Sequence, residues 1–234
     1  MPNPFLHNLR KFGFEFFSIF IGVFAAFALD NWNENRKDEV TEMKILTEIS
    51  NGLKQDIKDL ELNEKGHDMG LKAGQYYSRI INGQDATQDS VVIYYFNLFR
   101  DFISIQNISG YETLKSKGLE IVQNDSLRLK IIGLYENDYN SLRKLEEDYS
   151  ELQFHDSYFK EFNAVLAPNF IIDDAGKIKG IKQPIRIGEK EKKILLVYLW
   201  KMRTKRGIML GGYQEIKNKV KNLQKHIEEE LARD

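Results

Sequence analysis

The sequence predicts a mainly α protein, with one N-terminal transmembrane helix followed by an α-helical bundle that has long coiled-coil-like helices and a small β-hairpin near residues 170–180. Three observations predict this fold class. Residues 12–29 are apolar except for Glu15. Beyond them, apolar side chains recur at spacings of three and four, the period of an amphipathic helix. A short strand-turn-strand pattern lies between Pro168 and Pro184.

The apolar run at the N-terminus is long enough for a membrane helix. Its 18 residues span about 27 Å as a helix, and the flanks can supply the rest of a bilayer core. We therefore expect a cytoplasmic tail at residues 1–11, a transmembrane helix at 12–32 and an extramembrane helical domain at 33–234. A cleavable signal peptide is the alternative, because Ala26-Phe27-Ala28 resembles a cleavage site, although Glu15 interrupts its apolar region.

The charges around this segment give a weak orientation and exclude one class of partner. Lys and Arg tie at two on each flank, but the terminal amine and the acidic far flank favour a cytoplasmic N-terminus. The expected location is a bacterial inner membrane with a periplasmic C-terminal domain. The chain has 34 basic and 35 acidic residues, which argues against nucleic acid as a partner. It has no cysteine, which leaves the compartment open.

Small side chains gather on one face of the membrane helix. Spacings of three and four place together Glu15, Ser18, Gly22, Ala25 and Ala26. Such small residues let helix backbones approach closely within lipid, where no hydrophobic force drives helices together. The face therefore indicates packing with a second copy or with other integral membrane subunits. The alternative is that it reflects the ordinary abundance of glycine and alanine in membrane helices.

Charged and aromatic residues mark the two ends of this helix. Glu15 lies one turn inside the cytoplasmic end, with Lys11 four residues earlier on the same face. An ionisable residue at that depth indicates either pairing and helix packing or a titrating site. Trp32 is expected at the outer interface, where an amphipathic ring is favoured.

Two segments carry a family resemblance. The first comprises Glu15, Gly22 and residues 29–37, which read LDNWNENRK; the second runs from Tyr111 through Asn124 to Glu136. Together they resemble an uncharacterised family of small bacterial single-pass membrane proteins. The chain departs from the family pattern at Phe14, where glycine is usual, and at Asp30, where asparagine is commoner. The resemblance implies an inner-membrane protein with a helical extramembrane domain, and it brings no known activity.

The first half of the extramembrane domain is expected to be helical. Apolar residues from Met43 to Leu60 continue the anchor as one amphipathic helix. Gly66, Gly70 and Gly74 are expected to loosen a second helical stretch, which ends near residue 81 at an Asn-Gly turn. The plainest reason for their spacing is close packing against another helix. Residues 91–105 read as a buried core helix, too short and too charged at the centre to be a second span.

The second half predicts longer helices. Residues 125–166 read as one helix of about 60 Å, unless Gly133 bends it. Residues 189–205 form another helix, and the glycines of residues 207–212 are expected to break it. The last helix carries a coiled-coil seam of Tyr213, Ile216, Val220, Leu223 and Ile227. That seam suits packing on the first amphipathic helix or on a neighbouring subunit, and the sequence does not choose.

The sequence predicts no catalytic residue, no metal site and no cofactor. Glu151 and His155 lie one helical turn apart, but zinc needs at least a third ligand. His67 is expected on the surface or in a loop. The acidic run that begins at Glu146 and the basic cluster of residues 201–206 are expected to be solvated helix faces.

Two functional hypotheses follow. The first is a non-enzymatic, membrane-anchored assembly or accessory subunit of a bacterial envelope complex, oligomeric through the anchor face or the seam. The second is an ion-coupled or sensory single-pass protein in which Glu15 titrates. The lipid bilayer is a partner in both, and a hydrolytic enzyme is a remote third.

Overall fold

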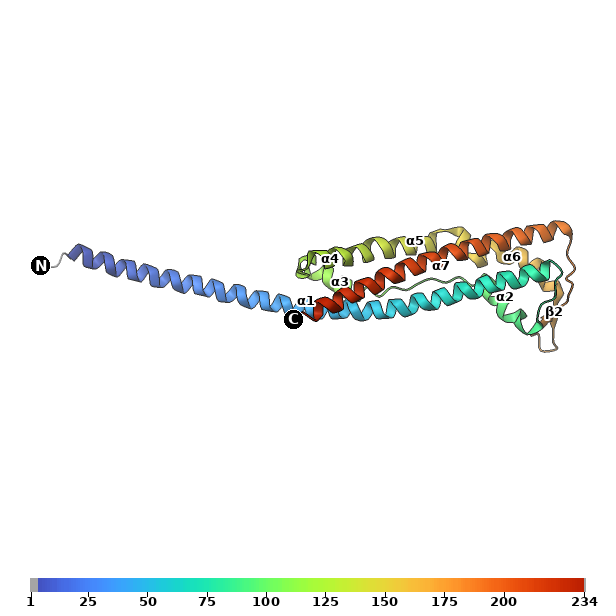
Figure 1. Cartoon of the computed structure of the whole chain (residues 1–234), viewed down its shortest axis with the longest axis horizontal. Coiled ribbons are helices and arrows are strands. Elements are labelled where there is room, and N and C mark those ends of the chain that lie inside the picture. The colour runs from blue at the N-terminus through green and yellow to red at the C-terminus, as the bar shows by residue number, and fades with distance from the viewer. Residues whose placement is uncertain (1–3, 234) are drawn as a thin grey trace.

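A single long helix organises the molecule. The computed structural model describes residues 4–233, with side chains from residue 16 onward except that of Glu151. Helix α1 (Pro4–Ile81) has 78 residues, which corresponds to about 117 Å. Its first part stands alone, and its second part lies in an elongated helical bundle (Figure 1). The predicted mainly α class is confirmed.

The glycines of α1 permit the predicted close packing, whereas the predicted loosening of the helix at Gly66, Gly70 and Gly74 is wrong. An added Cβ would lie 2.1 Å from the Phe102 ring at Gly66 and 2.3 Å from the Arg206 guanidinium at Gly70. The helix therefore runs on to Ile81 and ends in the expected Asn-Gly turn, where Gly83 has a φ of 76°.

Helix α7 (Glu189–Leu231) runs antiparallel to α1 along the whole bundle (Figure 1). The predicted break at residues 207–212 is wrong, because α7 continues through them for 43 residues in all. The seam residues are all buried, and they face the core that α7 shares with α1: Tyr213, Ile216, Val220, Leu223 and Ile227. The seam thus packs within the chain and is not available to a neighbouring subunit.

Several shorter helices complete the bundle: α3 (Ser109–Lys117), α4 (Asp125–Ile132), α5 (Tyr139–Asp148) and α6 (Phe154–Leu166). The expected single helix over residues 125–166 is wrong. A π-helical segment, Gly133–Asp138, joins α4 to α5, and α5 ends at Asp148, because the backbone of the next residue, Tyr149, is extended. One 3-10 turn, Ser150–Leu152, then leads to α6. The interruption buries Leu152 in the core while Tyr149 stays exposed.

Helix α2 (Val91–Phe99) is shorter than the predicted core helix of residues 91–105. After Phe99 the chain runs without helix or strand through residues 100–108 to α3, as the thin trace between the helices of Figure 1. We call residues 100–108 the extended segment. Helix α3 then approaches α1 closely at Gly110, where an added Cβ would lie 2.8 Å from the backbone nitrogen of Ile49.

The predicted hairpin is present at the end of the bundle farthest from the N-terminus (Figure 1). Strand β1 (Phe170–Ile172) pairs antiparallel with β2 (Ile178–Ile181), and Phe170 lies opposite Ile181. The Gln88 side chain accepts a hydrogen bond from the Ile181 backbone, which ties the hairpin to the connection between α1 and α2.

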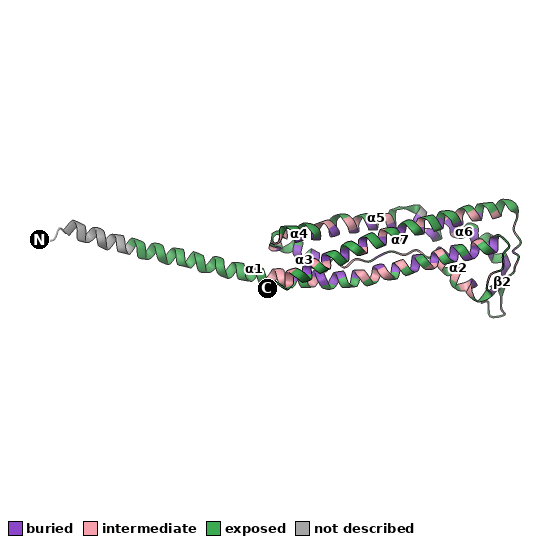
Figure 2. Cartoon of the chain, in the orientation of Figure 1, coloured by how far each residue is buried: buried purple, intermediate pink, exposed green. Residues whose placement is uncertain are grey.

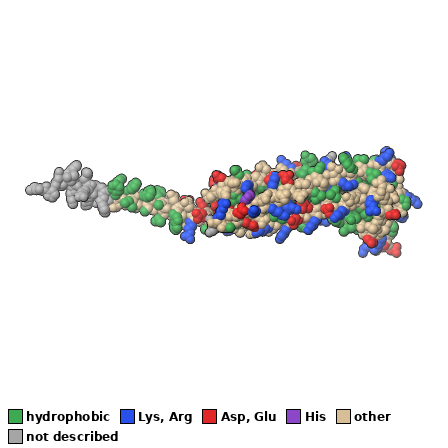
Figure 3. Space-filling model, viewed as in Figure 1, with side chains coloured by type: hydrophobic (Ala, Val, Ile, Leu, Met, Phe, Trp, Pro, Cys, Tyr) green, Lys and Arg blue, Asp and Glu red, His purple; other side chains and the backbone are tan. Residues whose placement is uncertain are grey.

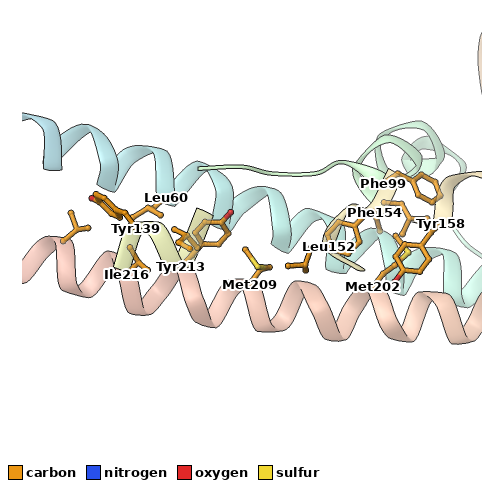
Figure 4. Packing of buried hydrophobic residues seen from close by; sticks show 14 of the residues in the cluster. Leu60, Phe99, Tyr139, Leu152, Phe154, Tyr158, Met202, Met209, Tyr213 and Ile216 are labelled. Atoms are coloured by element: carbon orange, nitrogen blue, oxygen red, sulfur yellow. The ribbon is translucent and has the colours of Figure 1, made fainter. Parts of the chain in front are cut away.

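The core is one continuous stack along the bundle. Near its middle, Tyr139 and Leu60 face Tyr213 and Ile216; farther along, Phe99 and Phe154 face Met202 (Figure 4). Burial begins at Ile45, while the described residues from 16 to 44 are exposed or half-buried (Figure 2). The core therefore includes no described residue before Ile45.

Candidate functional site

The projecting part of α1 carries an exposed apolar surface. None of its most apolar 18-residue window is buried, and the mean hydropathy of that window is 1.3. Hydrophobic side chains follow one another along it (Figure 3). Such a continuous surface is unusual on a protein that is surrounded by water. By length and composition, α1 is the one helix in the described part of the chain that could cross a membrane.

The predicted packing face lies on this exposed helix. Ser18, Gly22, Ala25 and Ala26 are all exposed, and a Cβ at Gly22 would meet nothing within 4 Å. The side chains of Lys11 and Glu15 lie outside the described residues. Trp32 is 62 % exposed, and the guanidinium carbon of Arg36 lies 5.8 Å from its ring centroid.

Because α1 is unbroken, the direction of the packing face can be followed into the bundle. Residues 36 apart are ten turns apart and point in about the same direction, so Gly22 aligns with Lys58 and Ala26 with Leu62. Seven side chains share this direction on α1: Asn51, Lys54, Lys58, Leu62, Lys65, Met69 and Lys72. We call them the lysine strip. None is acidic, and all except the half-buried Met69 are exposed; Lys54 and Lys72 form ion pairs within the chain, with Glu228 at 3.3 Å and Asp68 at 2.6 Å.

A buried arginine forms the centre of a second candidate site, inside the bundle. Arg206 on α7 is fully buried, and its Nη2 donates to the carbonyl oxygens of Asn97, Leu98 and Arg100 at 3.3, 3.0 and 3.0 Å. The last carbonyls of a helix have no partner within it. Arg206 therefore closes the C-terminal end of α2 and fixes where the extended segment starts.

A buried histidine lies next to Arg206. Its Nδ1 is 3.3 Å from Arg206 Nη1, which can only donate, so His67 accepts at Nδ1 and carries its proton on Nε2. Burial, together with the neighbouring positive charge, lowers the pKa of His67 to about 3. Burial also lowers the pKa of Arg206 to about 10, while Asp101 acts in the opposite direction. The pair is therefore a neutral imidazole beside a cationic guanidinium at neutral pH.

Aromatic rings enclose this pair. The Phe154 ring centroid lies 3.9 Å from the guanidinium carbon of Arg206, a cation–π contact. The His67 ring lies 5.3 Å from Phe102 and 5.4 Å from Tyr213, between centroids. Among the described side chains, His67 Nε2 and Arg206 Nε are the buried polar atoms without a hydrogen-bond partner.

Buried carboxylates hold the rest of the extended segment. Glu146 on α5 accepts from the Ser104 backbone nitrogen and hydroxyl, both at 3.0 Å, and from the Tyr213 hydroxyl. Burial raises the pKa of Glu146, and these hydrogen bonds oppose that change. The two donors from Ser104 make Glu146 an attachment point for the middle of the segment.

Two aspartates on α1 complete the attachment. Asp56 accepts from the Asn107 backbone nitrogen at 2.7 Å and from the Tyr139 hydroxyl at 2.6 Å. Burial raises the pKa of Asp56 to about 6. Asp59 accepts from the Ile105 backbone nitrogen at 2.9 Å. Side chains thus supply the hydrogen bonds that a strand partner would otherwise give to this backbone.

The comparison with known families rests on this same region. The chain matches the model of a family of unknown function (DUF6090) over residues 15–175, from the exposed apolar part of α1 through α6 and into the hairpin. The chain belongs to this family. The membership confirms an uncharacterised domain family, as the resemblance of the two sequence segments implied. No curated protein and no solved structure matches the chain.

Three sequence expectations for the buried centre are wrong. His67, Glu146 and Arg206 were expected on solvated surfaces, yet each is at most 4 % exposed. A signal was present in the sequence, because His67 lies seven residues after Leu60 and Arg206 lies seven residues before Tyr213. Each therefore falls on the apolar seam of its helix. Because both side chains can be charged, they were predicted to be exposed.

The buried centre organises backbone and presents no open reacting group. Its cation and carboxylates are directed at the end of α2 and at the extended segment. Among the described residues, no three His, Asp or Glu side chains are placed to hold a metal ion. The absence of catalytic and cofactor roles stays a prediction. The expectation that Glu151 and His155 do not hold a metal ion also stays a prediction, because the side chain of Glu151 lies outside the described residues.

Proposed function

We propose that this protein is a membrane-anchored, non-enzymatic accessory or assembly subunit of a bacterial envelope complex. The observation that carries the proposal is the continuity of α1, which is an exposed apolar helix at one end and a core helix of the bundle at the other. The resemblance to bacterial single-pass proteins supports an inner-membrane location. The weak charge bias supports a cytoplasmic N-terminus and a periplasmic bundle.

The geometry suits a subunit that holds the surface of its bundle at a fixed distance from the membrane. From Trp32, placed at the interface, to Ile45, where burial begins, α1 rises about 20 Å. From Ile45 to Ile81 it rises about 54 Å more. The hairpin end of the bundle would then stand about 75 Å from the membrane interface. No helix end interrupts α1 along this path.

The lysine strip favours a partner that is a different protein. It lies on the same side of α1 as Gly22 and Ala26, so a subunit packed on the anchor face would also run along the strip. In a symmetric pair, the strip would meet its own copy and place Lys58 and Lys65 opposite their equivalents, which is unfavourable. A membrane subunit with acidic side chains above its span fits this side better. Self-association limited to the anchor is the alternative.

Native mass measurement with subunit identification tests the proposal. Tagged full-length protein would be extracted from its own membranes in mild detergent. Additional subunits in fixed stoichiometry are the expected result. A single species at a whole multiple of 27.4 kDa would instead indicate self-assembly, and a monomer without partners would contradict the proposal.

Substitutions in the anchor show whether the small-residue face holds the complex together. Gly22→Leu and Ala26→Leu should lower the recovery of partner subunits, because leucine keeps the backbones apart. Ala28→Leu is the matched control, since Ala28 lies on another side of the helix. Equal recovery from all three variants would remove the anchor face from the proposal and leave the accessory role to the bundle.

Cysteine labelling tests the orientation, because the chain has no cysteine of its own. Asn8→Cys and Lys225→Cys would each be treated with a membrane-impermeant maleimide in intact spheroplasts. We expect labelling at position 225 and protection at position 8. The reverse pattern would place the bundle in the cytoplasm.

A further inference from the structure

A groove of about 520 Å³ lies between α2 and α6, on the outside of the bundle, and it adjoins the buried centre at Arg100, whose carbonyl oxygen accepts from Arg206. It is lined by Tyr95, Phe96, Phe99, Arg100, His155 and Phe159. Its volume lies within the range of about 300 to 1,000 Å³ that is common for small-molecule sites. Four of its six lining residues are phenylalanine or tyrosine, and two can carry a positive charge.

The floor of the groove is rigid. Tyr95 and Phe99 are buried, and the Tyr95 hydroxyl donates to Asn163 Oδ1 at 2.6 Å. The Phe99 ring meets the Phe159 ring edge to face at 5.3 Å between centroids. These contacts fix the ring of Phe159 on α6 as one wall.

The other wall is Phe96 on α2, which is 67 % exposed. A Phe side chain contributes most when it is buried, so this exposure leaves apolar area that a ligand could cover. The groove therefore offers two aromatic walls on a packed aromatic floor.

Arg100 brings a positive charge to the lining of the groove. Arg100 follows α2 directly and is exposed, with its guanidinium carbon 5.3 Å from the Phe102 ring centroid. The carboxylate of the next residue, Asp101, turns away to accept from the Phe154 backbone nitrogen at 2.6 Å. His155 stacks on Phe159 at 4.6 Å, and Asp156 is the acidic group at its side, 3.4 Å from His155 Nδ1. The Arg100 guanidinium is thus open to an anion.

We propose that this groove binds an aromatic monocarboxylate. Its ring would lie between Phe96 and Phe159, where offset or edge-to-face contacts are favourable. Its carboxylate would pair with Arg100, whose planar guanidinium matches a carboxylate through two parallel hydrogen bonds. The site is independent of the proposed accessory function, so either could fail without the other.

Fluorine NMR of the full-length protein in lipid nanodiscs tests the site directly. 4-Fluorophenylalanine at position 96 would report on the groove, and the same label at position 24 would report on probe dissolved in the bilayer. The probes are 1-naphthoate and its neutral analogue 1-naphthamide. We expect a saturable shift at position 96 with naphthoate, about tenfold weaker binding of naphthamide, and no saturable shift at position 24.

Two variants distinguish the contribution of the Arg100 charge to binding from that of the Phe159 ring. Arg100→Gln should weaken naphthoate about tenfold and leave naphthamide unchanged, whereas Phe159→Leu should weaken both probes. Leu129→Ala is the control, because Leu129 on α4 is exposed to the same degree as Phe96 but does not line the groove. The proposal is overturned if position 96 shows no saturable shift, or if naphthoate and naphthamide bind equally well.

Discussion

Replacing Arg206 by methionine removes the charge at the centre of the bundle and keeps an unbranched apolar stem. Three carbonyl oxygens at the end of α2 lose the donor that lies 3.0 to 3.3 Å from them. His67 Nδ1 loses its partner at 3.3 Å, and the cation–π contact with Phe154 is lost. Solvent cannot supply the missing donor, because position 206 is fully buried.

The expected loss of stability is about 3 to 5 kcal/mol. A well-packed apolar replacement of a buried charge can be neutral when all its partners are replaced as well. Here the acceptors are backbone and remain, and each buried acceptor left without a donor costs about 1 to 3 kcal/mol. Methionine also removes the desolvation cost of the buried guanidinium, and this gain offsets part of the cost of the unpaired acceptors. For a chain of this size, the loss corresponds to a fall in melting temperature of about 10 °C.

Thermal unfolding followed by circular dichroism, in the same detergent for each variant, measures this change. Arg203→Met is the matched control, because Arg203 lies one turn away on α7 but is exposed. We expect the control to change stability by less than about 0.5 kcal/mol. Hydrogen exchange in the extended segment should also accelerate in Arg206→Met. Equal melting temperatures for the two variants would refute the role assigned to Arg206.

Three further predictions concern single residues and are measured by urea unfolding. Gly66→Ala should destabilise by about 1 to 3 kcal/mol, because its Cβ would overlap a packed ring, whereas Gly211→Ala faces open space and should stabilise by about 0.5 to 1 kcal/mol; the opposite order would contradict the packing. His67→Gln should make stability less sensitive to acid: the pKa of His67 falls from 6.5 to about 3 on folding, so its contribution is complete above pH 6.5 and is lost toward pH 3. If the free energy of unfolding falls equally between pH 7 and pH 4.5 in His67→Gln and in the unsubstituted protein, the prediction is wrong. Tyr213→Phe should cost about 1.5 to 3 kcal/mol through the lost hydrogen bond to a buried carboxylate, with Tyr198→Phe as a nearly neutral control.

The glycine positions show where sequence reading failed for the helices. Glycine lowers helix propensity, so three glycines in α1 and three in α7 predicted a loosened helix and a break, although close packing was also predicted for those in α1. In α1, Gly66 and Gly70 are required because Phe102 and Arg206 occupy the space of a side chain. In α7, Gly207 and Gly211 face open space, and the packing of neighbouring turns on α1 keeps the helix intact. Tertiary contacts outweighed local propensity in both helices.

The interrupted helix and the extended segment were missed for a related reason. Residues 100–105 are rich in Phe and Ile, and they continue the apolar pattern of α2. Their backbone is nonetheless extended, because Arg206, Glu146 and Asp56 supply the hydrogen bonds that a helix would supply internally. Those side chains come from α7, α5 and α1, so no local pattern could reveal them.

By itself, the sequence determined the apolar N-terminal segment, its continuation into an amphipathic helix, the apolar seam from Tyr213 to Ile227 and the hairpin. These features follow from periodicity and composition within one segment, which act before the chain folds. Only the tertiary structure decided that the seam packs on α1 of the same chain, that Arg206 and His67 are buried together, and that Phe96 and Arg100 border an aromatic groove. Each depends on which distant segments meet, and burial and hydrogen bonding between those segments outweigh the preference of a single charged or glycine residue.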